Sequence, residues 1–440
     1  MKKQLFTLFA SALLALPALS QNKTAAEANA KAFVNHLTTQ QFTAAAAMFD
    51  EKVSEKVNDQ ALAQLWVSLQ MQMGPFQKTT NLQVQEQARQ HLVQQTCWFE
   101  KQNLDLKLVL DEQGKIAGIF FVPATQQKVA YELPEYADPA GFTEQELLIK
   151  SGNYELPATL TLPARKGKVP VVVLVHGSGP HDRDDSVGPN KPFKDLALGL
   201  AAQGIATLRY EKRTKKYASE VMEQYNTLTV QQEVLDDAVA AVRMLKSSKA
   251  LPVADVYVLG HSLGGMLAPR LAAQLPEVKG VVLMAANARP LEDLVLEQMQ
   301  YLLALQNNAS EAQLLPIKQQ VNTVKSSALT AETPSGQLPL GLPATYWLDL
   351  RPYKQTEVAR KLKQRVLVLQ GKRDYQVTTT DFKLWQEALK PKKNVEFKSY
   401  SKLNHLFLEG EGPGTPEEYN TPGHIPAYVI DYLAAWLKQK

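Results

Sequence analysis

Cysteine is almost absent from this chain: Cys97 is the only one in 440 residues. One cysteine cannot form an intrachain disulfide, even in an oxidising compartment, and it cannot build a zinc site. The seven histidines are not arranged in ligand-spaced pairs, so we expect no metal. We find no Walker or dinucleotide-binding glycine pattern, so we expect no cofactor either.

Long apolar runs are scarce as well. One stretch stands out, Leu5 to Leu19, and it follows Lys2 and Lys3. Because small residues occupy the cleavage-site positions at Ala18-Leu19-Ser20, we interpret residues 1–20 as a secretory signal peptide. A retained membrane anchor is the competing interpretation, but the run is shorter than a bilayer span. We therefore expect a periplasmic or secreted protein with no membrane span after cleavage.

The chain also lacks a strong charge excess. Its formal net charge is +4, and two of the lysines belong to the predicted signal peptide. A nucleic-acid-binding surface would need a basic run or a basic face interleaved with aromatic residues, and neither occurs. We therefore expect no nucleic-acid partner. The length and ordinary composition indicate one large and one small globular domain.

Two patterns follow the predicted signal peptide. Residues 21–125 contain helical stretches and then β-rich ones, Val84 to Phe99 and Leu104 to Leu110, which predicts a small α+β domain. Thr24-x-x-Glu27 is a capping box that opens the first predicted helix. A proline- and acid-rich connector predicts a linker at residues 126–142.

From residue 143 to residue 440 the pattern is α/β. Near-continuous Val/Leu strands such as Val169 to Val175 alternate with helices, which indicates a parallel sheet covered on both faces. Far more residues separate the strand Gly280 to Met284 from the strand Arg365 to Leu369 than one connecting helix needs. We predict that residues 287–350 form a helical lid over the carboxyl edge of the sheet, where sites in open α/β folds lie.

Gly260-His261-Ser262-Leu263-Gly264 is a G-x-S-x-G motif between a predicted strand and a predicted helix. This motif works as a strained turn in which glycines remove clashing Cβ atoms and the serine hydroxyl projects from the sheet. We predict that Ser262 is a nucleophile. A chance pentapeptide is the alternative, which the placement disfavours. We expect His261 to point elsewhere.

A serine hydroxyl is a poor nucleophile at neutral pH and needs an imidazole to take its proton. His405 follows the last predicted strand and is the predicted base; His424, farther downstream, is the second candidate. Asp374, just beyond a strand, is the predicted acid that orients the imidazole, with Asp381 as the alternative. The order serine, acid, histidine suits acyl transfer through a covalent acyl-enzyme.

An oxyanion hole needs backbone N–H groups aimed at the developing negative charge. We predict that one is the amide of Leu263, directly after the nucleophile. The other is the amide of Ser178, in the loop His176-Gly177-Ser178-Gly179 that follows the first long strand. A plain glycine turn is the alternative for this loop.

Contacts with substrate are less sharply indicated. His181 lies in the dense charge cluster His181-Asp182-Arg183-Asp184-Asp185, a candidate for substrate contact or for supporting its loop by ion pairs, although a solvated loop explains it equally well. The segment Glu211-Lys212-Arg213 has the same explanations. Tyr346 and Trp347 in the predicted lid are candidates for lining an acyl or alcohol pocket, with the hydrophobic core as the alternative.

The loop from Val175 to Asp184, its continuation Gly188 to Asp195, and the segment Gly260 to Gly265 resemble the α/β-hydrolase superfamily. Within it, the chain is similar to secreted bacterial serine carboxylesterases with a small amino-terminal domain of unknown function. The resemblance covers about Glu146 to Lys440. The amino-terminal region resembles the α+β cone of nuclear-transport-factor-like domains.

This resemblance implies an α/β-hydrolase sheet with a helical lid, and a triad of Ser262, Asp374 and His405. In the family the loop usually reads Pro-Asn-Asp-Arg-Asp, whereas this chain has His181 in place of the asparagine. The departure leaves the triad intact and bears on substrate preference.

The sequence therefore predicts a serine hydrolase that cleaves small-molecule carboxylic esters with short acyl chains. A peptidase or a thioesterase on the same residues is one alternative, because the fold does not fix the leaving group. A non-catalytic ligand-binding protein is the other. A homodimer is left open.

Overall fold

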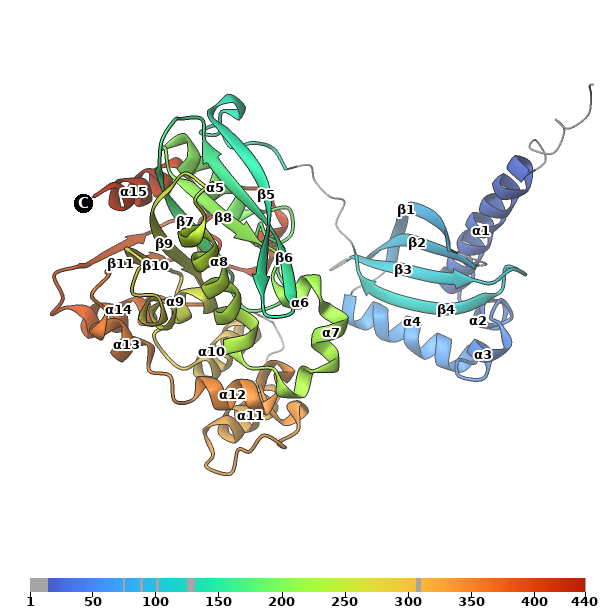
Figure 1. Cartoon of the computed structure of the whole chain (residues 1–440). Coiled ribbons are helices and arrows are strands. Elements are labelled where there is room, and N and C mark those ends of the chain that lie inside the picture. Colours follow the sequence, from blue (N-terminus) through green and yellow to red (C-terminus); the bar gives the residue numbers. More distant parts are fainter. Residues whose placement is uncertain are drawn as a thin grey trace, which may run out of the picture. The chain divides into compact units, whose positions relative to one another are not determined.

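The computed structural model describes residues 15–73, 76–87, 90–99, 103–124, 131–305 and 310–439. The chain divides into two compact units, Met1–Lys128 and Val129–Lys440 (Figure 1). Most of the predicted signal peptide, residues 1–14, lies outside the described residues. No helix in the described part of the chain has the length and hydropathy needed to cross a bilayer.

The first unit is a four-stranded antiparallel meander with helices. Its elements are α1 (Ala15–Thr38), α2 (Phe42–Ala46), α3 (Glu51–Ser54), α4 (Asp59–Met73), β1 (Phe76–Gln87), β2 (Gln90–Phe99), β3 (Asn103–Leu110) and β4 (Ile116–Pro123). Alternate residues of β3, from Leu104 to Leu110, are buried in one core with Phe33 and Trp66. The small α+β domain is confirmed, because period-two burial in the strands gives the helices one apolar face to cover.

Two details of this unit differ from the sequence predictions. The stretch from Val84 to Phe99 belongs to two paired strands, β1 and β2. Helix α1 runs through Thr24, so this residue lies inside the helix rather than at its N-cap, because favourable helix formers continue on both sides of the motif.

The second unit is built on an eight-stranded sheet in the order β12-β11-β10-β9-β7-β8-β6-β5. The strands from β12 to β8 are parallel, whereas β6 and β5 join antiparallel at one edge. Their bounds are β5 (Phe142–Ser151), β6 (Tyr154–Pro163), β7 (Val169–Val175), β8 (Ala206–Tyr210), β9 (Val253–His261), β10 (Gly280–Met284), β11 (Arg365–Gly371) and β12 (Val395–Tyr400). The predicted α/β-hydrolase sheet is confirmed.

Helices cover both faces of this sheet because successive residues of each strand point to opposite sides. Val171 and Val173 of β7 pack in one core, and Val172 and Leu174 pack in the other. The first core is shared with α8 (Asp236–Ser247), α9 (Leu263–Gln274), α13 (Gln355–Lys361) and α14 (Thr379–Leu389), and the second with α5 (Pro192–Ala202) and α15 (Ala427–Lys438).

The insertion after β10 contains α10 (Leu291–Ala304), α11 (Leu315–Lys325) and α12 (Ala344–Leu350). Its two ends pack on different loops. Tyr301 of α10 donates to the Gly414 carbonyl at 2.8 Å, whereas Thr345 of α12 donates to the Leu228 carbonyl at 2.8 Å. The insertion thus connects loops on both sides of strand β9, the strand that leads to Ser262.

The predicted linker is only partly a linker. Residues 125–130 lie outside the described residues, but Tyr131 donates to Asp195 at 2.6 Å and Tyr136 donates to the Ile425 carbonyl at 2.9 Å. The two tyrosines belong to the second unit, because their rings and hydroxyls find partners on α5 and before α15. The predicted boundary at residue 142 is therefore too late.

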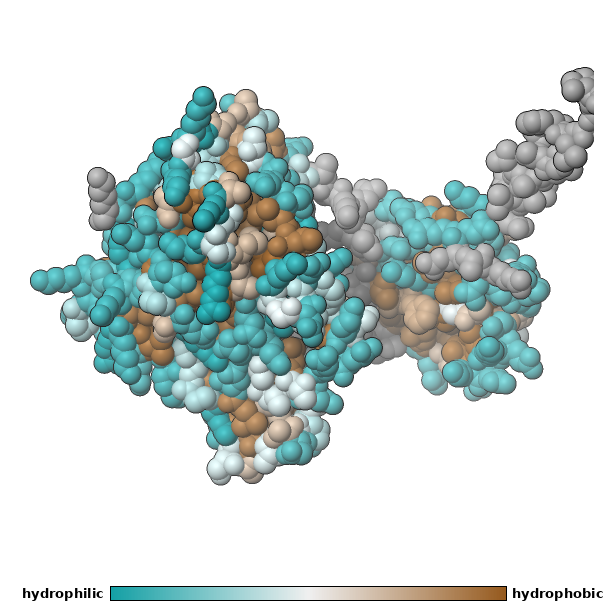
Figure 2. Space-filling model, viewed as in Figure 1, coloured by the Kyte–Doolittle hydropathy of each residue, from teal (hydrophilic) through white to brown (hydrophobic). Residues whose placement is uncertain are grey.

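The surface of the second unit is mostly hydrophilic in the view of Figure 2, with hydrophobic residues gathered in separate patches. One exposed apolar side chain is Leu148, 55% exposed on β5 at the edge of the sheet. Isolated exposure of this kind is common on protein surfaces and by itself indicates no site.

Candidate active site

Ser262 lies at the turn between β9 and α9, with φ 54° and ψ −117°. This left-handed conformation is costly for a residue with a side chain and is typical of functional turns. Its N–H donates to the Met284 carbonyl at 2.9 Å. A Cβ on Gly260 would lie 2.1 Å from the Gly264 carbonyl oxygen, so the glycines allow the strand and helix to meet closely enough to form the turn.

Asp374 and His405 come together from the loops after β11 and β12. His405 Nδ1 donates to Asp374 Oδ2 at 2.7 Å. The other carboxylate oxygen accepts from the N–H groups of Gln376 and Val377 at 2.8 and 2.9 Å. The carboxylate is thereby fixed, and it holds the imidazole in the tautomer that leaves Nε2 able to accept a proton.

In the described residues the Ser262 hydroxyl makes no hydrogen bond, so the serine–histidine contact of a triad is not formed in this structure. The His405 ring lies beside His261, with centroids 4.7 Å apart, and His261 precedes the serine in the chain. Such contacts are often long in unliganded enzymes and tighten when substrate binds.

A second imidazole–carboxylate pair lies next to the first. His261 Nδ1 is 2.9 Å from Asp185 Oδ2, and His261 Nε2 is 2.9 Å from the His405 carbonyl oxygen. Because both partners are acceptors, both ring nitrogens donate, and His261 is an imidazolium. It therefore cannot act as a base, and it holds the backbone of His405 in place.

The ionisation of this second pair follows from its surroundings. Burial acts to lower the pKa of His261, but the hydrogen bond and charge of Asp185 raise it above the ordinary value. Burial acts to raise the pKa of Asp185, but the hydrogen bond from His261 and the nearby imidazoles lower it. The sequence places Asp185 in a charge cluster that is a candidate for supporting its loop by ion pairs, but it does not predict the contact with His261, which is far away in the chain.

The loop after β7 lies against Ser262. A Cβ on Gly177 would lie 3.2 Å from Ser262 Cβ and 3.7 Å from Ser262 Oγ, so a side chain at this position would crowd the serine. Within the described part of the chain, the N–H groups of Ser178 and Leu263 have no hydrogen-bond acceptor. Two free N–H groups on chain segments beside the serine are what an oxyanion hole requires.

The alternative acid and base are occupied elsewhere. His424 Nδ1 is 3.0 Å from Asp195 Oδ1. Asp381 accepts from the N–H groups of Ala288 and Arg289 at 2.9 and 3.0 Å. Neither residue takes part in the pairing of Asp374 with His405.

Two of the three predicted substrate contacts require correction. Tyr346 and Trp347 are 1% and 0% exposed and belong to the large core of the second unit, so they offer no surface to substrate. His181 is also engaged, because its Nε2 donates to the Ser178 carbonyl at 2.7 Å and its Nδ1 is 3.1 Å from Asp185. It supports the loop, and because its side chain is 21% exposed, its contact with substrate stays a prediction.

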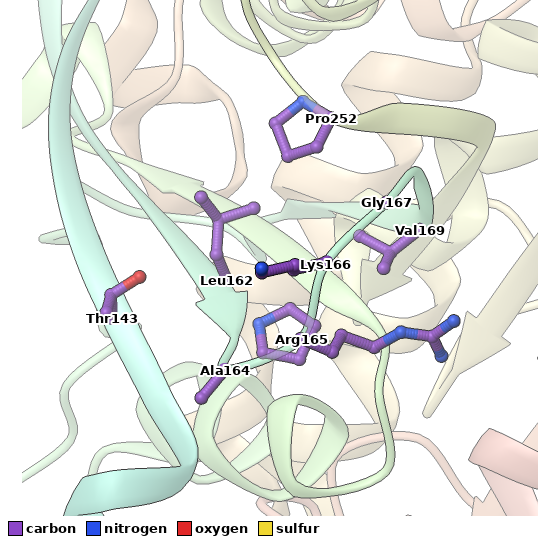
Figure 3. Close-up of a pocket in the computed structure, with 9 residues that line it drawn as sticks. Thr143, Leu162, Ala164, Arg165, Lys166, Gly167, Val169 and Pro252 are labelled. Atoms are coloured by element: carbon purple, nitrogen blue, oxygen red, sulfur yellow. The ribbon is translucent and has the colours of Figure 1, made fainter.

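Figure 3 shows residues that line a pocket, among them Thr143, Leu162, Arg165, Lys166, Val169 and Pro252. The volume of this cavity is about 370 Å³. Val169 is the first residue of β7, whereas Ser262 follows the carboxyl end of the parallel neighbour β9. The cavity therefore lies at the opposite edge of the sheet and is not the substrate site.

Comparison with known proteins places the two units in different families. Residues 168–411 match the family described as "Serine aminopeptidase, S33", and residues 30–119 match "Protein of unknown function (DUF3887)". The chain is 40% identical to Esterase EstD of Thermotoga maritima over 405 residues, which are 92% of this chain and 93% of that protein.

Two solved structures are similar to part of the chain. Est1E from Butyrivibrio proteoclasticus is 17% identical, covers 67% of this chain and 99% of its own length, and gives a TM-score of 0.44. The Pyrococcus furiosus esterase Pf2001 is 16% identical, covers 68% and 92%, and gives a TM-score of 0.41.

Proposed function

Because the chain belongs to the α/β-hydrolase family described as "Serine aminopeptidase, S33", we propose that it hydrolyses carboxylic esters through Ser262, His405 and Asp374. The identity to Esterase EstD over most of both chains supports the reaction class. The observation that carries the assignment of residues is the hydrogen bond from His405 to Asp374 beside a serine in a strained strand-to-helix turn.

In the first half of the reaction, Ser262 Oγ attacks the ester carbonyl carbon while His405 Nε2 takes the hydroxyl proton. The carbonyl oxygen becomes an oxyanion that accepts from the N–H groups of Ser178 and Leu263. Collapse of this intermediate breaks the bond to the alkoxide. The alkoxide takes the proton from His405 and leaves as the alcohol.

In the second half, water attacks the acyl-serine and gives its proton to His405. The same N–H groups stabilise the second oxyanion. Collapse returns the proton to Ser262 Oγ and releases the carboxylic acid. Asp374 stays ionised throughout and stabilises the imidazolium that forms twice in each cycle.

Further features of the function are proposals of the same kind. A lysine-led apolar start supports secretion to the periplasm or beyond. The resemblance to secreted carboxylesterases supports small esters with short acyl chains, and the helices between residues 287 and 350 are the proposed lid. Peptide hydrolysis is the second candidate, because the family description itself names an aminopeptidase.

The test compares wild type with Ser262→Ala on p-nitrophenyl esters of increasing acyl length and on aminoacyl anilides. We expect turnover of short esters by wild type and less than about 0.1% of it in the variant, because removing a triad member costs about 10⁶-fold in a related hydrolase chemistry. A fluorophosphonate probe should label wild type only.

Three results would contradict the proposal. Retention of more than a few percent of activity in Ser262→Ala would mean that another nucleophile acts. Anilide hydrolysis faster than ester hydrolysis would favour the peptidase. Absence of both labelling and turnover in folded wild type would favour a binding protein.

A further inference from the structure

Lys212 is a fully enclosed lysine that the proposed reaction does not use. It follows β8 and precedes the short helix α6 (Arg213–Lys216), and its side chain is 2% exposed. Its Nζ donates to the carbonyl oxygens of Gly177 and Gly179, both at 2.8 Å, and lies 2.7 Å from Glu233 Oε1. All three N–H bonds of the ammonium group therefore have partners.

Glu233 connects this lysine to the insertion. It lies in the π-helical turn η3 (Gln231–Leu235), and its side chain is 7% exposed. Its second oxygen accepts from the hydroxyl of Tyr346 in α12 at 2.7 Å. Burial and the charge of Glu233 hold the pKa of Tyr346 well above its ordinary value, so the phenol stays a donor. We call Lys212, Glu233 and Tyr346 the buried relay.

The two carbonyl groups bound by Lys212 lie on either side of Ser178. A peptide bond is planar and trans, so its C=O and N–H point in opposite directions. When the Gly177 carbonyl faces Lys212, the N–H of Ser178 must point away from the lysine. Gly177 itself lies against Ser262, so this orientation leaves the Ser178 N–H free beside the nucleophile.

The remaining carbonyl of the loop is also held, because His181 donates to the Ser178 oxygen. Rotation of either peptide around Ser178 would therefore break a hydrogen bond to the buried Lys212 ammonium group or to the partly exposed His181 ring. A buried ion pair is an expensive way to fill a core, since apolar residues of the same volume are often as stabilising or more so. Its use here points to orientation of the loop rather than to packing.

We propose that Lys212 is the positioning residue that orients the Ser178 N–H in the oxyanion hole, and that Glu233 and Tyr346 tie this orientation to helix α12 of the insertion. The inference rests on the proposed function, because it assigns a supporting group to that site. If α12 moved away, Tyr346 would leave Glu233, and the support that Glu233 gives Lys212 would weaken. The geometry of the oxyanion hole therefore depends on the position of α12.

The decisive variant is Lys212→Met combined with Glu233→Gln, which removes both charges and leaves neither unpaired. The matched control is Lys215→Met, an exposed lysine on the short helix α6 that directly follows Lys212. The substrates are a p-nitrophenyl ester and its thionoester, in which sulfur replaces the carbonyl oxygen. Sulfur accepts hydrogen bonds poorly, so only the oxygen ester gains fully from an oriented N–H group.

We expect the double variant to lose about 10²-fold in kcat on the oxygen ester, the loss typical of one oxyanion donor, with KM within about twofold. The thionoester should lose less than about fivefold, so the preference for oxygen over sulfur falls. Lys215→Met should match wild type on both substrates. Equal losses on the two substrates, or an unchanged preference, would overturn the proposal.

Tyr346→Phe is the second variant and keeps the ion pair intact. We expect kcat on the oxygen ester to fall three- to tenfold and the preference for the oxygen ester over the thionoester to fall as well. An unchanged preference would refute the proposed link between the oxyanion hole and α12. Failure of the proposed function is distinguishable from failure of this inference. In the first case wild type neither turns over esters nor reacts with fluorophosphonate; in the second case it does both.

Discussion

Two carboxylate–imidazole pairs lie side by side at the carboxyl edge of the sheet, and they differ in one hydrogen bond. In both pairs Nδ1 faces an aspartate, at 2.7 Å in His405–Asp374 and 2.9 Å in His261–Asp185. The Nε2 of His261 also donates, to the carbonyl of His405. The Nε2 of His405 has no such partner in the described residues, so only this imidazole can exchange a proton with a substrate.

Burial does not distinguish the two pairs. The side chains of His405 and Asp374 are 5% and 0% exposed, and those of His261 and Asp185 are 6% and 2% exposed. An imidazole with both nitrogens committed is a structural cation, whereas one with a free nitrogen is a candidate base. The ring nitrogen without a hydrogen-bond partner, rather than the burial of the pair, therefore distinguishes the candidate base.

The largest effect should come from the first pair. Asp374→Asn keeps the shape of the side chain, but it no longer selects the tautomer of His405 or stabilises the imidazolium. We expect kcat on a short ester to fall about 10⁴-fold with little change in KM. The measurement is steady-state kinetics, with circular dichroism to verify the fold. A loss smaller than tenfold would mean that Asp374 does not orient the base.

In contrast to Asp374→Asn, we expect Asp185→Asn to lower stability strongly and activity only modestly. The variant leaves a buried imidazole without its counter-ion, so we expect the free energy of unfolding to fall by about 3 kcal/mol. Because His261 then holds the His405 carbonyl less firmly, kcat should fall only about tenfold. Denaturant titration and kinetics on the same samples measure both. A catalytic loss as large as that of Asp374→Asn would erase the distinction between the pairs.

His176 and His261 have pKa values shifted in opposite directions, so they should affect the pH dependence of stability in opposite ways. Burial lowers the pKa of His176 to about 4, so the neutral ring stabilises the fold above pH about 6.5, and this contribution is lost as the pH falls toward 4. The pKa of His261 is raised, so its contribution is complete below pH about 6.5 and is lost as the pH rises through the raised value.

We therefore expect His176→Gln to lose less stability than wild type on acidification from pH 7 to pH 4.5, by roughly 2 kcal/mol. The deficit of a His261→Asn variant relative to wild type should instead shrink as the pH rises above neutrality. Melting temperatures from pH 4.5 to pH 9 test both statements. Parallel curves for the three proteins would show that neither imidazole carries the assigned protonation state.

The smallest effect is expected for His424→Asn. This imidazole pairs with Asp195, which also accepts from Tyr131 and from the N–H of Ile425. We expect kcat/KM within about twofold of wild type and a loss of about 1 kcal/mol in stability, the cost of one hydrogen bond. A catalytic loss above a hundredfold would reinstate His424 as the base.

Much of the fold was predictable because its signals are local. Valine- and leucine-rich runs such as β7 can only be buried strands, and glycines on both sides of Ser262 indicate a tight turn. The sequence also pointed to Asp374 and His405, because each follows a strand that ends at the same edge. Their catalytic roles remain predictions. The hairpin at β1 and β2 was missed, since no turn residue separates the two β-rich halves clearly.

The failures concern residues whose partners are distant in the chain. Tyr346 and Trp347 were candidates for substrate contact because aromatic residues in an insertion can line a pocket, but the insertion buries both. His261 was expected only to point away from the site, whereas its ring pairs with Asp185 and donates to the backbone carbonyl of His405. Lys212 was considered only as a candidate substrate contact or a solvated loop residue, whereas it is buried and donates to two loop carbonyls.

The sequence by itself determined the succession of strands and helices, the strained turn at Ser262, and the order in which Ser262, Asp374 and His405 follow one another. These depend on side-chain period and on backbone conformation, which neighbouring residues set. Only the tertiary structure decided which buried charges face each other: Asp185 with His261, and Lys212 with Glu233. A buried charge must find its partner among groups brought close by folding, and no local pattern specifies which groups those are.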